Sequence, residues 1–281
     1  MPSIERLERF HVLDGAGLAG SEIVWDWSAV RLPHDEAGGG PAVVLLHAGI
    51  ADRTMWSEHL ERLADAGYRA VAVDLPGFGE ARVTPGEQAP WADVLRTMDE
   101  LSIERAALVG NSFGGAVALR TALVAPDRVS ALALISAPPP ALKPSPELEA
   151  AWEAEEAALQ RGDIEAAVDA VLDAWTLPDA SPELRDRVAA MQRRAFARQA
   201  EAPPTTEAPD PVEQHPETLP RLSVPTLVAA GELDKRDFRQ GAEAMARTLP
   251  RARHAVVKRA GHLAPLETPE AFRELVLDFL R

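Results

Sequence analysis

The chain has 281 residues, no cysteine and a formal net charge of −15 at pH 7. The length indicates one large domain, or one domain that carries an insertion, with enough residues for a full hydrophobic core. The lack of cysteine excludes disulfides, cysteine-ligated zinc and a thiol nucleophile, and the acidic charge disfavours nucleic acid and anionic membranes as partners.

Residues 1–137 alternate strand-like and helix-like segments. Residues 21–30 alternate polar and apolar side chains, which is typical of a half-buried strand. Short and almost entirely apolar runs follow, typical of parallel strands covered on both faces, at residues 42–46, 70–73, 106–109 and 131–135. Helical patterns separate these runs at residues 55–66, 92–101 and 114–124. This alternation predicts an α/β fold with a parallel sheet and helices on both of its faces.

Residues 138–215 break the pattern, because they contain prolines and helical signals but no strand-like run. Two segments of the form Ser-Pro-Glu, which begin at Ser145 and Ser181, are typical helix starts, and Asp163 is a third candidate N-cap. Trp152 and Trp175 occupy apolar helical positions, which predicts packing within this segment or a place in the lining of a pocket. We therefore predict a helical module inserted into the α/β core.

Residues 216–281 return to strand and helix alternation. Strand-like runs lie at residues 226–230 and 255–257, and helical patterns at residues 238–249 and 271–280. The expected organisation is thus a core formed by residues 1–137 and 216–281, with residues 138–215 as the insertion.

The sequence Gly110-Asn111-Ser112-Phe113-Gly114 carries the strongest chemical signal. It follows the apolar run 106–109 and precedes a helical pattern, and G-x-S-x-G at such a turn is typical of a nucleophile elbow. The glycines leave room for a strained serine, and the helix N-terminus directs its N–H groups to the same point. The pattern predicts that Ser112 is a nucleophile.

At this motif the chain resembles the α/β-hydrolase family, and the resemblance extends over nearly the whole sequence. The segment His47-Ala48-Gly49 stands where the family has His-Gly-x, and residues 74–79 look like its D-x-P-G-x-G loop. Asp234 and His262 follow later strands, where the family places its acid and its histidine. The resemblance implies a mostly parallel eight-stranded sheet with helices on both faces, and residues 138–215 as a helical cap.

The resemblance also implies the roles of three side chains. Ser112 would be the nucleophile, His262 its general base, and Asp234 the acid that orients the imidazole. Asp237 lies three residues after Asp234 and is an alternative acid, although Asp234 fits the position after the strand better.

Backbone N–H groups of Gly49 and Phe113 are the expected oxyanion hole, with Ile50 as an alternative to Gly49. Ala48 replaces a glycine of the family pattern in this loop. His47 is expected to organise the loop rather than to act as a base, because the resemblance places the base in the last loop.

No metal or cofactor is expected. The remaining histidines show no paired spacing typical of metal ligands; they are His11, His34, His59, His215 and His254. Residues 15–20 match G-x-G-x-x-G, but a strand pattern follows them instead of the helix that a dinucleotide site requires. The expected partner is a small-molecule substrate, with no nucleic acid and no membrane, and the oligomeric state is left open.

The sequence predicts a serine hydrolase that cleaves a small, mostly apolar ester or lactone through an acyl-enzyme. An alternative is a C–C bond hydrolase of β-diketone-type ring-fission products, which Gly-Asn-Ser resembles, although Leu263 stands where that subgroup often has tryptophan. A non-catalytic ligand-binding protein on the same scaffold is a further alternative. Without a signal peptide or an apolar run of membrane-spanning length, we expect a cytoplasmic protein, and the arginine and alanine bias is typical of a high-GC bacterial genome.

Overall fold

The structure is a computed structural model, and it describes residues 31–281. The strand expected over residues 21–30 and the glycine motif at residues 15–20 lie outside the described residues. Within them, the main feature is a seven-stranded sheet in the order β1-β3-β2-β5-β6-β8-β9, in which β1 is antiparallel and every other pair is parallel. The strands are β1 (His34–Ala37), β2 (Ala42–Leu46), β3 (Arg69–Val73), β5 (Ala106–Asn111), β6 (Val129–Ile135), β8 (Thr226–Gly231) and β9 (Ala252–Val257).

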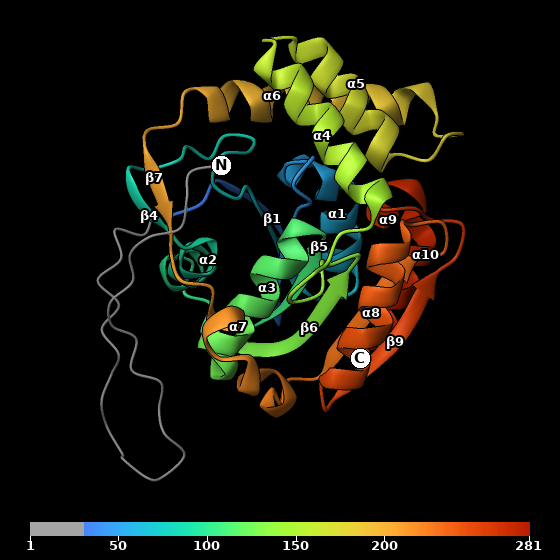
Figure 1. The fold of residues 1–281 in the computed structure, drawn as a ribbon. Helices are drawn as coiled ribbons and strands as arrows, with labels where there is room; N and C mark the ends of the chain where they lie inside the picture. Colours follow the sequence, from blue (N-terminus) through green and yellow to red (C-terminus); the bar gives the residue numbers. More distant parts are fainter. Residues whose placement is uncertain (1–30) are drawn as a thin grey trace.

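Helices cover both faces of this sheet, as the sequence predicts (Figure 1). In β2, Val43 and Leu45 belong to one hydrophobic cluster and Val44 and Leu46 to the other, because successive side chains of a strand point to opposite faces. Of the helices beside the sheet, α1 (Ser57–Asp65) and α10 (Pro269–Leu280) contribute to the first cluster, and α2 (Pro90–Glu100), α3 (Phe113–Val124) and most of the buried face of α8 (Arg236–Thr248) contribute to the second. In residues 31–281, no helix is long and apolar enough to span a bilayer.

Three helices lie between β6 and β8 in the chain. They are α4 (Pro146–Gln160), α5 (Ile164–Trp175) and α6 (Pro182–Ala200). The predicted N-caps Ser145, Asp163 and Ser181 are confirmed, since each side chain accepts a hydrogen bond from the backbone three residues on. Figure 1 shows the three helices together beyond the sheet, on the side toward which β6 and β9 point. They therefore lie over the carboxyl ends of the strands.

The prediction that residues 138–215 contain no strand is wrong. Strand β7 (Thr205–Glu207) pairs in parallel with β4 (Gly86–Gln88) and forms a separate two-stranded sheet. Both strands have three residues and are mostly polar, which is too short for a detectable hydrophobic period. The remaining short helices are η1 (Arg53–Trp56), η2 (Pro126–Arg128), α7 (Pro211–Gln214), η3 (Pro216–Arg221) and α9 (Ala264–Glu267).

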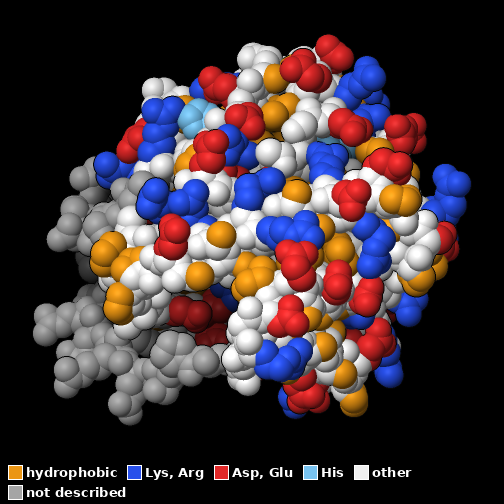
Figure 2. Space-filling model, turned by 90° about the horizontal axis from the view of Figure 1, so that it is seen from above, with side chains coloured by type: hydrophobic (Ala, Val, Ile, Leu, Met, Phe, Trp, Pro, Cys, Tyr) orange, Lys and Arg blue, Asp and Glu red, His pale blue; other side chains and the backbone are white. Residues whose placement is uncertain are grey.

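Helix α6 is bonded to the loops that follow β2 and β3. Arg194 forms an ion pair with the buried Asp52 at 2.5 Å, and Gln199 Nε2 donates to the carbonyl of Gly77 at 3.4 Å. Arg193 pairs instead with a glutamate of α5. Figure 2 shows acidic and basic side chains intermingled when the molecule is viewed from above, the side on which α4 to α6 lie. Local ion pairs thus partly offset the acidic charge of this segment.

Candidate active site

Ser112 lies at the turn between β5 and α3, with φ of 52° and ψ of −116°, in the region of positive φ that non-glycine residues rarely adopt. Tight packing holds the turn in this conformation. A β-carbon on Gly110 would lie 2.3 Å from the carbonyl oxygen of Gly114, and one on Gly114 would lie 2.2 Å from that of Leu46. Only glycine fits at both positions, which explains the local sequence pattern.

A chain of hydrogen bonds joins the three side chains that the sequence singled out. Ser112 Oγ is 2.8 Å from His262 Nε2, and His262 Nδ1 is 3.0 Å from Asp234 Oδ1. The Asp234 side chain is 0% exposed and that of His262 is 5% exposed. Because a carboxylate accepts the Nδ1 proton, Nε2 of a neutral ring is free to accept the hydroxyl proton of Ser112.

Asp237, the alternative acid, lies elsewhere. Its carboxylate accepts hydrogen bonds from the backbone N–H of Ser145 at 2.7 Å and from the Ser145 hydroxyl at 2.8 Å. Asp237 thus joins α8 to the start of α4, and it is Asp234 that contacts His262.

Two aromatic rings pack on the His262 imidazole. The Trp175 ring centroid, at the end of α5, is 4.6 Å away, and that of Phe238, in α8, is 4.4 Å away. Trp175 therefore connects the inserted helices to the candidate site. Trp152 does not share this role, because it is 42% exposed on α4, and for it the prediction of internal packing is wrong.

Asn111 is a residue of this site to which the sequence analysis gave no role. It is fully buried, and its Nδ2 donates to the carbonyl oxygens of Ile135 and His262, each at 3.1 Å. The side chain thereby ties the end of β5 to the loop that carries His262. In the sequence, the signal that could have indicated Asn111 was its position directly before Ser112.

Gly49 and Phe113 lie against each other, since a β-carbon on Gly49 would be 3.5 Å from Cβ of Phe113. Among residues 31–281, no hydrogen bond is donated by the backbone N–H of either residue. The amide of Phe113 belongs to the first turn of α3, where N–H groups have no partner within the helix. Both amides thus lack an acceptor within the described residues, and their role as an oxyanion hole stays a prediction.

His47 connects the loops after β2 and β3. Its Nδ1 donates to the carbonyl of Ala48 at 2.8 Å, and its Nε2 accepts the backbone N–H of Leu75 at 2.9 Å. Burial lowers the pKa of His47 below that of a free histidine, so the ring is neutral at pH 7. This geometry agrees with the expected role of His47 in organising the loop.

Among known proteins, some relatives align with only part of this chain and others with nearly all of it. A 2-hydroxy-6-oxo-6-phenylhexa-2,4-dienoate hydrolase of Comamonas testosteroni is 38% identical over 117 residues, which cover 39% of this chain and 41% of that relative. A 2-hydroxy-6-oxononadienedioate/2-hydroxy-6-oxononatrienedioate hydrolase of Burkholderia vietnamiensis is 30% identical over 276 residues, which cover 92% of this chain and 94% of the relative. The similarity to the first is thus confined to less than half of its length.

Solved structures of hydrolases are also similar to this chain. A thermophilic esterase from Thermogutta terrifontis has 30% identity and a TM-score of 0.71, over 89% of this chain and 93% of that one. The enol-lactonase from Burkholderia xenovorans LB400 has 27% identity and a TM-score of 0.73, over 89% and 96%. In the described residues no group of three or more histidine, aspartate or glutamate side chains is arranged to hold a metal ion. The family model for the alpha/beta hydrolase fold matches residues 41–269, and the chain therefore belongs to this family.

Proposed function

We propose that the protein is a serine hydrolase that cleaves a small, mostly apolar ester or lactone, with Ser112 as the nucleophile. The observation that carries the proposal is the 2.8 Å contact between Ser112 Oγ and His262 Nε2 at a tightly packed turn. A neutral serine hydroxyl is a poor nucleophile, and an adjacent imidazole held by a buried carboxylate activates it.

In the proposed reaction, Oγ of Ser112 attacks the substrate carbonyl while His262 takes the hydroxyl proton. The negative charge that develops on the carbonyl oxygen is stabilised by the N–H groups of Phe113 and Gly49. The imidazolium then gives its proton to the departing alcohol oxygen, which leaves an acyl group on Ser112. Water then attacks the acyl carbon while His262 takes its proton. The bond to Ser112 Oγ breaks, the imidazolium returns the proton to Oγ, and the acid is released.

Helices α4 to α6 act as a cap over this site in our proposal. Trp175 and Phe238 flank His262, and the rings of Phe78 and Phe113 lie 6.0 Å apart on the side of the loop after β3. These aromatic walls favour an apolar acyl group, in keeping with neighbours named as an esterase and an enol-lactonase. The expected partner remains a small-molecule substrate, and a cytoplasmic location remains a prediction.

Carbon–carbon bond hydrolysis of a ring-fission product is the second candidate. The 30% identical relative that aligns over 92% of this chain is named as a hydrolase of 2-hydroxy-6-oxo acids. The Asn111 side chain next to Ser112 also fits the Gly-Asn-Ser resemblance noted above. Against this candidate, fully buried Leu263 follows His262, where that subgroup often has tryptophan.

The test begins with a fluorophosphonate probe, with the adduct located by peptide mass spectrometry and Ser112→Ala as the control. We expect a single adduct on Ser112 that is absent from the variant. Turnover is then compared for a p-nitrophenyl ester, a lactone and a 2-hydroxy-6-oxo-dienoate. Preference for the dienoate would favour the second candidate. Tight ligand binding without labelling or turnover would instead support a binding protein.

A further inference from the structure

A second carboxylate reaches the loop that carries His262. Glu267, the last residue of α9, accepts the backbone N–H of Gly261 through Oε2 at 2.7 Å. Its other oxygen is also close, since a β-carbon on Gly261 would lie 3.1 Å from Oε1. The Glu267 carboxylate therefore rests against the residue that directly precedes His262.

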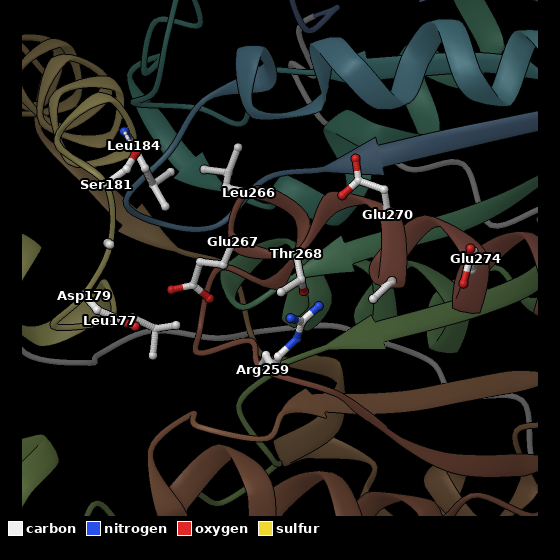
Figure 3. A pocket seen from close by; sticks show the side chains of 12 residues that line it. Leu177, Asp179, Ser181, Leu184, Arg259, Leu266, Glu267, Thr268, Glu270 and Glu274 are labelled. Atoms are coloured by element: carbon white, nitrogen blue, oxygen red, sulfur yellow. Dashed lines mark hydrogen bonds between the residues drawn. The ribbon is translucent and has the colours of Figure 1, made fainter.

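Glu267 lines a cavity of about 650 Å³ that the proposed reaction does not use. Figure 3 shows its carboxylate among the lining side chains, with Leu177 and Arg259 below it in the view. Burial raises the pKa of Glu267 to about 6, while the Gly261 N–H and the charge of His262 act in the opposite direction. Glu267 is thus charged at neutral pH, and it gains a proton in the pH range where an ordinary histidine titrates.

We infer that Glu267 is a positioning residue for His262, which fixes the histidine loop through Gly261 and stabilises the imidazolium with its negative charge. The inference rests on the proposed function of Ser112 and His262. Asp234 contacts the ring itself, whereas Glu267 acts through the backbone and at longer range. Its charge has influence because a buried carboxylate is screened less than one in water.

Other charged groups also face this region. Asp234 acts on the same imidazole from the loop after β8. Around the cavity lie one basic and three further acidic side chains, which are Arg259, Asp179, Glu270 and Glu274. Glu270 and Glu274 are exposed, so their charges are weakened by solvent. Glu270 is therefore a matched control, as it lines the same cavity without contacting Gly261.

The test uses Glu267→Gln, which keeps an oxygen to accept the Gly261 N–H but removes the charge. Loss of a nearby anion makes the imidazolium less stable, so His262 should gain its proton only at lower pH. We expect its titration midpoint, followed by NMR of the ring protons, to fall by about half a pH unit. The rate at which the fluorophosphonate labels Ser112 falls in acid, and in Glu267→Gln this fall should move to lower pH by the same amount.

In Glu270→Gln, the His262 midpoint and the midpoint of the labelling rate should both stay within about 0.1 pH unit of wild type, because a surface charge is screened by solvent. Glu267→Asp keeps the charge and should also stay near wild type; a midpoint of Glu267→Asp that falls by about half a pH unit would overturn the charge effect, even if Glu267→Gln fails to fold. His262→Asn identifies the ring signal. An unchanged midpoint in folded Glu267→Gln would overturn the inference, as would slower labelling without a shifted limb. Absence of labelling in wild type would contradict the proposed function, and the NMR titration would still decide the role of Glu267.

Discussion

Replacing either of the two aspartates that follow β8 should separate their roles. In Asp234→Asn the buried group that accepts the Nδ1 proton of His262 loses its charge, and no water can replace it because the side chain is 0% exposed. The imidazolium formed during attack is then unsupported, and an amide can also hold the ring in the wrong tautomer. Substitutions of this kind lower kcat by about 10⁴, which corresponds to about 5 kcal/mol.

Asp237→Asn should instead keep the activity and lower the stability. Turnover should stay within about threefold of wild type, because Asp237 contacts Ser145 instead of the proposed catalytic residues. The two charge-assisted hydrogen bonds to Ser145 become neutral ones, which should lower the free energy of unfolding by about 1 kcal/mol. The assay compares p-nitrophenyl ester turnover and urea unfolding of both variants. Comparable losses of activity in the two, or the larger loss in Asp237→Asn, would refute this reasoning.

Three further outcomes are expected. Gly114→Ala should abolish fluorophosphonate labelling, because its methyl group overlaps the backbone of Leu46. Gly39→Ala, whose methyl group would have no atom within 4 Å, should label like wild type. Equal labelling of the two variants would contradict the packing argument. The raised pKa of Glu267 means that its ionisation opposes folding, so stability falls between about pH 4.5 and 6. By urea unfolding, Glu267→Gln should therefore gain up to about 2 kcal/mol relative to wild type at pH 7.5 but not at pH 4. Arg194→Gln should lower the free energy of unfolding by about 1 kcal/mol, because the ion-pair partner Asp52 is buried. The same loss in 1 M salt would argue against an ionic contribution.

The elements that position Ser112 could be predicted because their signals are local. An apolar run, a glycine-flanked serine and a helical pattern are adjacent in the sequence, and each requires its own residue types. The acid was harder to assign, since Asp237 lies only three residues after Asp234 and only the position directly after the strand favoured Asp234. Their difference arises from the turn after β8, which directs one carboxylate to His262 and the other to Ser145.

Long-range polar contacts outside the family motifs escaped prediction. The pairing of β4 with β7 joins two short polar segments that are more than a hundred residues apart. Glu267 resembles any surface glutamate of a C-terminal helix in the sequence. Its burial depends on α9 and on Leu177, which approaches from the segment between α5 and α6. Periodic patterns in the sequence do not indicate contacts between segments that are far apart in the chain.

The conformation of Ser112 has a consequence for how the protein reaches its native state. The positive φ is held by contacts of Gly110 and Gly114, and the latter reaches the end of β2, more than sixty residues earlier in the chain. A partly folded chain that lacks the β2–β5 pairing has nothing to maintain this turn. Reactivity of Ser112 should therefore return only at the last stage of refolding, after helix content has recovered, so a serine-directed probe reports the completion of core assembly.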